Sequence, residues 1–151
     1  RELYQTGFMH NRVRMIVASF LVKNLNIDWR LGASWFWDCL VDADLASNGL
    51  NWQWVAGCGV DPSPYYRIFN PILQGKKFDP DGHYVCRWLP ELQRLNFPQG
   101  HAPWLIDKVQ LLEADVFLGD NYPKPIVDLR QSRDVALKLF QDLKFKKNKL
   151  L

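Results

Sequence analysis

The chain has 151 residues, of which 48% are hydrophobic and 23% charged, a composition typical of a soluble globular protein with a core of its own. No apolar stretch approaches the length of a bilayer span and no signal peptide is visible, so neither a membrane segment nor secretion is predicted. A net charge of +3 permits a polyanionic partner, and three scattered cysteines, Cys39, Cys58 and Cys86, favour a reducing, cytoplasmic compartment over a disulfide framework or a zinc site.

The clearest predicted element is a helix over residues 11–25. Apolar side chains recur there at the helical interval on two sides, so we expect the helix to be buried on both. We expect one side to pack into the hydrophobic core. The other side begins with a polar Asn and a polarisable Met, which suits the wall of a cavity. The first side comprises Val13, Ile16, Val17, Phe20 and Leu21, and the second comprises Asn11, Met15, Ala18, Val22 and Leu25.

The elements that follow are also predicted to be helical, because alternating β-branched runs are almost absent. Asp28-Trp29-Arg30 is predicted to be a connector. Helices are predicted over residues 32–41 and 45–56. A turn is predicted at residues 61–64, where two prolines fix φ and bias their neighbours away from helix.

Shorter helices are predicted in the second half of the chain, over residues 71–74, 84–89 and 103–112. The Asp-Pro-Asp-Gly sequence at residues 79–82 predicts a turn. Asp128 is a good N-cap for the last helix, whose predicted core stripe consists of Ala136, Leu139, Phe140 and Leu143. These elements together predict an all-α fold in a single domain over residues 1–151.

The ends of the chain carry two further signals. The sequence begins with Arg1 rather than Met, and residues 1–4 have the character of the interior of a longer sequence, so we expect a fragment or an excised domain. We expect the basic run at the end to be a solvated tail, with nucleic-acid binding as the alternative. Basic residues gather near the start at Arg12, Arg14, Lys23 and Arg30, and at the end at Lys144, Lys146, Lys147 and Lys149.

Polar and aromatic side chains share one face of the helix predicted over residues 45–56. Asp44, Asn48 and Trp52 recur at intervals of four residues and therefore lie on the same side. In one interpretation Asp44 caps the helix, Asn48 is exposed and Trp52 belongs to the core. In the other, a polar ligand binds along this face, with a carboxylate for ribose or amine donors, an amide for a heterocycle edge and an indole beside it. Asp42 precedes this face by two residues, and the pattern leaves both interpretations open.

A second polar group lies at the start of the first long helix. Arg12 and Arg14 are two positions apart and point in different directions, so one could reach an external phosphate while the other pairs with an internal carboxylate. The alternative is a solvated helix start, with Met15 filling a gap beside Asn11. Sequence spacing leaves open whether this segment meets the segment that carries Asp42.

The sequence contains seven tryptophans. Trp29, Trp52 and Trp54 could be ordinary core or surface anchors, or members of a chain that conducts electrons to a redox cofactor. Neither a GxGxxG nor a Walker A motif occurs, and the histidines do not fall at metal-ligand spacing, so no metal site is predicted. These histidines are His10, His83 and His101.

Eight runs resemble the DNA photolyase and cryptochrome family, in the family's order and over nearly the whole chain. The resemblance implies the C-terminal portion of an all-helical FAD-binding domain, with FAD as the cofactor in a U-shaped form. The runs are TGFMHNRVRM at residues 6–15, DWR at 28–30, DADLASN at 42–48, WQW at 52–54, YYRIFNP at 65–71, QGKKFD at 74–79, RWLPEL at 87–92 and YPKPIVD at 122–128.

The resemblance implies a cofactor role for four residues. Asp42 and Asp44 match the acidic pair beside the flavin ring and ribitol, and Arg14 matches the arginine that pairs with Asp42. Asn48 matches the residue that faces flavin N5, where an amide can donate or accept a hydrogen bond. Plant cryptochromes usually carry Asp at this position and animal cryptochromes Cys, so Asn48 favours a photolyase.

The resemblance also implies a light-driven reaction. Trp52 and Trp29 match the proximal and middle members of the family's photoreduction chain, whose distal member lies upstream of this sequence. Excited, reduced FAD would give an electron to a cyclobutane pyrimidine dimer, which splits and returns the electron. The alternative function is a cryptochrome-type blue-light photoreceptor that signals without repair.

The implied partner is DNA that contains pyrimidine dimers, bound by a monomer. Asn11, Met15 and Trp54 match residues that line the pocket for a flipped dimer, and an aromatic side chain such as Trp54 can stack on thymine. Arg12 matches a contact to the phosphate of the damaged strand. Arg67 is assigned to the same surface.

Two departures from the family pattern affect these expectations. Gly49-Leu50-Asn51 stands where photolyases often carry Asn-Gly-Gly after the N5-facing Asn, which points to a less common subgroup. The family's antenna domain and the helices that clamp the FAD phosphates and adenine have no counterpart in the sequence, so the antenna chromophore stays unknown. We therefore expect the chain alone to bind FAD weakly or not at all and to lack repair activity. A third alternative is a helical DNA-binding remnant that acts by itself.

Overall fold

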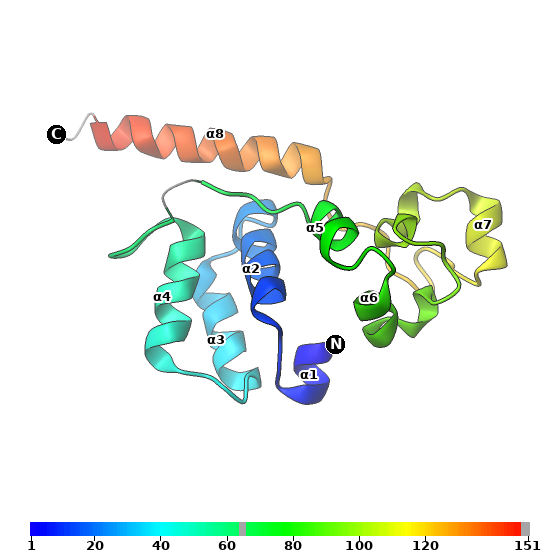
Figure 1. The fold of residues 1–151 in the computed structure, drawn as a ribbon. Coiled ribbons are helices and arrows are strands. Elements are labelled where there is room, and N and C mark those ends of the chain that lie inside the picture. The colour runs from blue at the N-terminus through cyan, green and yellow to red at the C-terminus, as the bar shows by residue number, and fades with distance from the viewer. Residues whose placement is uncertain (64–65, 149–151) are drawn as a thin grey trace. The chain divides into compact units, whose positions relative to one another are not determined.

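The computed structural model describes residues 1–63 and 66–148, with the side chains of residues 144–148 outside the description. Within these ranges the regular elements are helices, with one isolated bridge between Leu118 and Tyr122, and the predicted all-α class is confirmed (Figure 1). Tyr65 and Lys149 lie outside the described residues. Because the side chains of Lys144, Lys146 and Lys147 also lie outside the description, the solvated basic tail stays a prediction.

The helices form two compact units. The first unit comprises residues 1–69 and 127–151, and the second comprises residues 70–126. The single domain over residues 1–151 stays a prediction. The first unit contains α1 (Glu2–Thr6), α2 (Asn11–Ser19), the π-helix η1 (Phe20–Asn24), α3 (Trp29–Cys39), α4 (Leu45–Ala56) and α8 (Leu129–Asn148).

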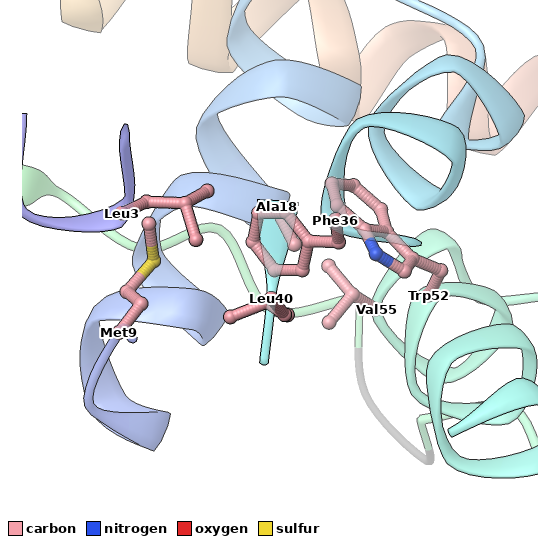
Figure 2. Packing of buried hydrophobic residues seen from close by; sticks show 7 residues of the cluster. All are labelled: Leu3, Met9, Ala18, Phe36, Leu40, Trp52 and Val55. Carbon is pink, nitrogen blue, oxygen red and sulfur yellow. The ribbon is translucent and has the colours of Figure 1, made fainter. Parts of the chain in front are cut away.

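The core of the first unit forms where α2, α3 and α4 meet. The Trp52 ring lies edge-on to Phe36, with ring centroids 5.0 Å apart. It also covers Gly32 so closely that a Cβ at Gly32 would lie 2.6 and 2.7 Å from two of its ring carbons, which requires glycine there. Figure 2 shows the buried side chains of this core, which are Leu3, Met9, Ala18, Phe36, Leu40, Trp52 and Val55.

The helix predicted over residues 11–25 is present as α2, which continues into η1. The His10 ring nitrogen Nδ1 caps it by accepting the Arg12 backbone N–H at 3.2 Å. As expected for a helix buried on two sides, α2 and η1 pack against α4, while α8 packs against η1. The wider π turn was not anticipated, and it places Lys23 and Asn24 in the interior.

Two predictions for the first unit are corrected. Asp28-Trp29-Arg30 is not a connector, because Asp28 accepts the Arg30 N–H at 2.9 Å and caps α3, which begins at Trp29. The helix predicted over residues 32–41 therefore begins three residues earlier and ends at Cys39. By contrast, α4 has the predicted bounds, between the Asp44 cap and Gly57, whose φ of 80° ends the helix in the left-handed region.

The predicted core stripe of α8 is only half right. Asp128 accepts the Gln131 N–H at 2.7 Å, as expected of an N-cap, and Ala136 is buried. Leu139 and Leu143 are exposed, however. The inward contacts of α8 follow the row of Ser132, Ala136 and Phe140, which recur at intervals of four residues, and Leu139 and Leu143 lie beside this row rather than on it.

The second unit has its own small core, formed by Leu92, Leu95, Leu111, Ala114 and Val116. The turn predicted at residues 79–82 is present, and the Asp79 carboxylate accepts the N–H groups of Tyr84 and Val85 at 2.9 and 3.0 Å. The elements are α5 (Pro71–Phe78), α6 (His83–Trp88), the 3₁₀ helices η2 (Pro90–Leu92), η3 (Gln99–His101) and η4 (Pro103–Leu105), and α7 (Lys108–Glu113).

Two helices of the second unit differ from prediction. The helix predicted over residues 71–74 extends to Phe78, after a cap in which Asn70 accepts the Ile72 and Leu73 N–H groups. The helix predicted over residues 103–112 is instead two helices, because Asp107 accepts the Val109 and Gln110 N–H groups and starts α7 anew.

Candidate functional site

The first unit contains a cavity of about 470 Å³ that is open to solvent on one side. Its walls come from α2, α3 and α4, from residues 40–44 between α3 and α4, and from the loop that follows α4. This volume lies in the range of ligand sites in proteins. Three predicted site residues, Arg12, Trp29 and Arg67, do not line the cavity. The eight that do are Asn11, Arg14, Met15, Asp42, Asp44, Asn48, Trp52 and Trp54.

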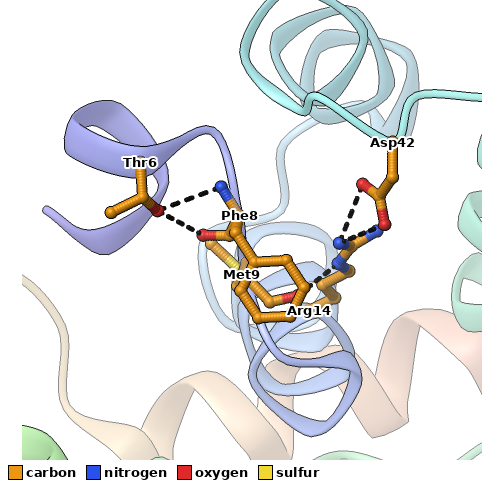
Figure 3. A network of polar contacts seen from close by, with 5 residues as sticks. All are labelled: Thr6, Phe8, Met9, Arg14 and Asp42. Carbon is orange, nitrogen blue, oxygen red and sulfur yellow. Dashed lines mark hydrogen bonds and ion pairs between the residues drawn. The ribbon is translucent and has the colours of Figure 1, made fainter.

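An ion pair joins the two segments whose meeting the sequence left open. The Arg14 nitrogen Nη2 donates to both carboxylate oxygens of Asp42, at 3.0 and 2.9 Å (Figure 3). Arg14 Nε donates to the Met9 carbonyl at 2.6 Å, which fixes the guanidinium from a second side. The expected Arg14–Asp42 pairing is therefore present. Because α2 and the segment before α4 are held together, the two polar groups found in the sequence face one cavity.

The turn before α2 is shaped by local hydrogen bonds. Thr6 Oγ1 donates to the Glu2 carbonyl at 2.7 Å and accepts the Phe8 N–H at 3.1 Å. Gly7 adopts a φ of 68°, and its carbonyl accepts the Val41 N–H at 2.9 Å. Figure 3 shows this turn leading into Met9, whose carbonyl receives Arg14. The turn thus helps to set the position of the ion pair.

Asp44 combines a structural role with a place in the cavity wall. Its carboxylate accepts the Ser47 N–H at 2.7 Å and caps α4. Hydrogen bonding from the Ser47 backbone is the main reason that the pKa of the Asp44 carboxyl lies below its ordinary value. The capping interpretation is therefore correct, and the same group presents a stable negative charge to the cavity.

Asn48 is half-buried rather than exposed, and α3 orients it. Its Nδ2 donates to the Ala33 carbonyl at 2.8 Å. Because a carbonyl can only accept, the NH₂ group must face Ala33, and Oδ1 points the other way. Among the hydrogen bonds of the described residues, none engages Oδ1. Asn48 therefore offers the cavity a held amide with an acceptor still available.

The three tryptophans occupy different environments. Trp52 is 3% exposed, so its interpretation as a core residue is correct, although its edge also lines the cavity. Trp29 is half-buried against the same core, with the Arg30 guanidinium 5.1 Å from its ring centroid. Trp54 is half-buried in the cavity wall. Trp52 and Trp29 thus share one packed cluster, and their role as an electron chain stays a prediction.

The two arginines expected to contact phosphates are exposed. Arg12 lies in the first turn of α2, and Arg67 lies between α4 and α5. Neither lines the cavity. Their exposure fits a contact with an external polyanion, and the contact itself stays a prediction.

Sequence reasoning missed one wall of the cavity. Gln53, Cys58 and Asp61 line it from the end of α4 and the loop beyond. Gly57 and Gly59 both have positive φ, and the loop folds back so that the Ser63 N–H bonds the Trp54 carbonyl at 3.2 Å. A glycine at each of two alternate positions directly after a helix is the signal that could have predicted this reversal.

Two kinds of feature are absent from the described residues. None of their helices is both long and apolar enough to cross a bilayer. No three side chains among their His, Cys, Asp and Glu residues converge as metal ligands would.

Comparison with known proteins assigns the chain to a family. Residues 1–142 match the model of the FAD-binding domain of DNA photolyase. A deoxyribodipyrimidine photo-lyase of Agrobacterium fabrum is 59% identical over 144 residues, which are 95% of this chain and 30% of that protein. The chain thus spans about a third of the length of this relative.

Solved structures give the same assignment. The crystal structure of a class III photolyase from Agrobacterium tumefaciens matches with a TM-score of 0.91 at 59% identity, over 95% of this chain and 30% of that one. The crystal structure of a cryptochrome from Synechocystis matches with a TM-score of 0.87 at 47% identity, over 91% of this chain and 28% of that one.

Proposed function

Because the chain belongs to the FAD-binding domain family of DNA photolyases and cryptochromes, we propose that it supplies part of the flavin and DNA sites of a light-dependent enzyme that repairs cyclobutane pyrimidine dimers. One observation carries this proposal. The Arg14–Asp42 pair, Asp44 and Asn48 line the same cavity as Met15 and Trp54. Polar groups suited to a flavin and apolar groups suited to an extruded base thus share one space.

The polar residues fit the ring end of FAD. Asp44 provides a carboxylate acceptor, and Asn48 provides a free amide oxygen beside an N–H fixed on Ala33. Arg14 neutralises Asp42, so the wall does not concentrate two uncompensated negative charges. When bound, FAD supplies the light-absorbing electron donor. The residues of this chain hold the ring, orient its edge toward Asn48 and exclude water on the side of Trp52.

The apolar and basic residues fit damaged DNA. Met15 and Trp54 offer a polarisable and an aromatic surface on which an extruded pyrimidine pair can stack, with Asn11 at the same wall. Arg12 and Arg67 are exposed and can contact strand phosphates, which position DNA without reading its sequence.

A blue-light photoreceptor of the cryptochrome type is the second candidate. The match to the Synechocystis cryptochrome favours it, because the fold similarity is nearly as high as that to a photolyase. Asn48 argues for repair through the family resemblance.

Substitution of Asn48 with Cys, the residue usual in animal cryptochromes, removes the acceptor oxygen. In the full-length protein we expect this variant to destabilise the fully reduced flavin by about 0.5–1.5 kcal/mol, the size of one hydrogen bond. An unchanged reduction potential would contradict the assignment of Asn48 to the flavin.

Photoreactivation of damaged DNA decides between the two candidates. The full-length protein with reduced FAD is incubated with ultraviolet-damaged single-stranded DNA under blue light, and restored thymines are counted against a dark sample. We expect restoration only in the light. A flavin that responds to light while the dimers persist would favour the photoreceptor. The 151-residue chain alone is expected to restore none, because in the family other segments clamp the FAD phosphates and adenine.

Trp54 provides a further test of the proposed function. Truncation to Ala in the full-length protein should weaken binding of dimer-containing DNA by about 1–3 kcal/mol, the value of one base stacked on an aromatic ring. Undamaged duplex, which has no extruded base, serves as the control. Equal affinity of wild type and variant for the damaged strand would remove Trp54 from the lesion pocket.

A further inference from the structure

Lys23 is a buried cation, and no ion pair joins it to a carboxylate among the described residues. It belongs to η1, and the residue is only 4% exposed to solvent. Its Nζ donates to the Arg67 carbonyl at 2.6 Å and lies 4.4 Å from the centroid of the Tyr66 ring. A lysine is rarely buried without an acidic partner, because desolvation of its charge is costly. The cost of burying this charge indicates that Lys23 has a role that a neutral side chain could not perform.

Three contacts fix the backbone on both sides of Arg67. The Tyr66 ring stacks on Phe140 of α8, with centroids 4.1 Å apart and planes 10° from parallel. The Phe69 N–H donates to the fully buried Ser19 Oγ at 3.1 Å. Lys23 holds the carbonyl between them. The Arg67 residue itself is exposed, so a fixed backbone carries a cationic side chain at the surface.

We propose that Lys23 is a positioning residue for DNA binding, which holds the Arg67 backbone so that the Arg67 guanidinium is presented to a strand phosphate. The proposal rests on the proposed function and deepens it, because it assigns to an interior residue the placement of a surface contact. Lys23 does not touch DNA. It acts through the hydrogen bond to the Arg67 carbonyl and through the Tyr66 ring.

Electrostatics give this arrangement a dependence on pH. Burial, and secondarily the Arg67 charge, lower the pKa of Lys23 to about 8. Among the described residues, the titratable groups that act on its ammonium are Arg67, through its charge, and Tyr66, whose ring lies beneath Nζ and whose own pKa is raised by burial, while Phe140 of α8, stacked on Tyr66, is uncharged. A phosphate at Arg67 brings a negative charge near Lys23 and favours its protonated form. By linkage, DNA binding takes up a proton, and affinity falls as the pH rises through about 8.

The test compares Lys23→Met, Arg67→Ala and the double variant in the full-length, FAD-containing protein. Affinity for a duplex carrying one thymine dimer and for the undamaged duplex is measured against salt concentration at pH 7. Each single variant should bind both duplexes about three- to tenfold more weakly, with the salt slope reduced by about 0.9, the value of one phosphate contact. The double variant should be no weaker than Arg67→Ala. Lys138→Met, which removes one charge from an exposed site on α8, is the matched control and should retain wild-type affinity.

The outcomes separate this inference from the proposed function. If Arg67→Ala binds as the wild type does, the phosphate contact in the proposed function is wrong and the inference is overturned with it. If Arg67→Ala weakens binding while Lys23→Met does not, or if the two losses add, only the positioning role is overturned. If Lys23→Met fails to fold, proton uptake on DNA binding is measured at pH 8 in the wild type and Arg67→Ala. Uptake in the wild type that Arg67→Ala abolishes supports the inference, and equal uptake in both overturns it.

Discussion

Among the described residues, the side-chain hydrogen bonds that join the most distant parts of the sequence lie in the first unit. In the first unit Asn24 Nδ2 donates to Ser132 Oγ over a separation of 108 residues, and Lys23 reaches Arg67 over 44. In the second unit Asp79 and Asp107 accept N–H groups from the residues that follow them by two to six positions. Loss of a bond of the first kind should alter the geometry of a site, whereas loss of the second kind should cost local stability alone.

The largest expected effect tests how tightly the first unit is packed behind the cavity. Gly32→Ala places a methyl group inside the van der Waals envelope of the Trp52 ring, so we expect a loss of about 1–3 kcal/mol or more in the free energy of unfolding. Chemical denaturation measures this loss. Gly49→Ala is the matched control, since it lies in α4 with no heavy atom near its added Cβ. That variant should gain about 0.5–1 kcal/mol from helix propensity. Equal effects of the two substitutions would contradict the close packing of Trp52.

The next expected effect concerns the buried charge of Lys23, in the first unit. The pKa of Lys23 is lowered from 10.5 to about 8 in the folded protein, so between these values the unfolded chain binds the proton and the folded chain does not. The free energy of unfolding should therefore rise with pH from about 8 to about 10.5, by roughly 1–3 kcal/mol in total. Urea titrations of the wild type and Lys23→Met at several pH values isolate this term by difference. A difference that does not change with pH would show that Lys23 is solvated.

The sequence predicted those features of the first unit that local chemistry determines. The bounds of α4 follow from the capping carboxylate of Asp44 and the left-handed conformation that Gly57 tolerates. Asp28 carries the same capping signal and starts α3 at Trp29, which the prediction of a connector at residues 28–30 does not take into account. The family resemblance predicted the Arg14–Asp42 pair. Sequence spacing alone could not predict that α2 and the segment before α4 lie next to each other.

Other features had no local signal that decides them. The π turn η1 interrupts a run whose apolar residues follow the ordinary helical period, so nothing in the pattern marks it. Lys23 is buried although lysine is nearly always exposed, and its contacts with the Tyr66 ring and with the Arg67 carbonyl, 44 positions away, explain this. The exposure of Leu139 and Leu143 depends on which side of α8 meets the rest of the unit. Contacts between distant parts of the sequence determine these features, and all of them lie in the first unit, which contains the cavity.

A smaller effect compares one ion pair from each unit. Arg14 is 23% exposed and Asp42 52% exposed, whereas Arg94 and Asp115 of the second unit are exposed by 62% and 66%. Because exposed pairs are screened by solvent, Arg94→Gln should change the free energy of unfolding by less than about 0.5 kcal/mol. Arg14→Gln should cost about 1 kcal/mol and should also weaken FAD binding by the full-length protein. Flavin retention after gel filtration measures the second effect, and retention unchanged by Arg14→Gln would place the pair outside the cofactor site.

The smallest expected effect uses one helix cap from each unit. Asp44 and Asp107 cap α4 and α7 through the same type of backbone hydrogen bond, so Asp44→Ala and Asp107→Ala should each lower the thermal midpoint by a few degrees. The pKa of Asp44 is below its ordinary value in the folded state, so its contribution is complete at neutral pH and is lost as the pH falls through that lowered value. Only Asp44→Ala should also weaken flavin binding, because only Asp44 combines a cap with a place in the cavity wall. If both variants bind FAD equally well, the acidic group at the start of α4 is a cap and nothing more, and the distinction between the two units fails at this residue.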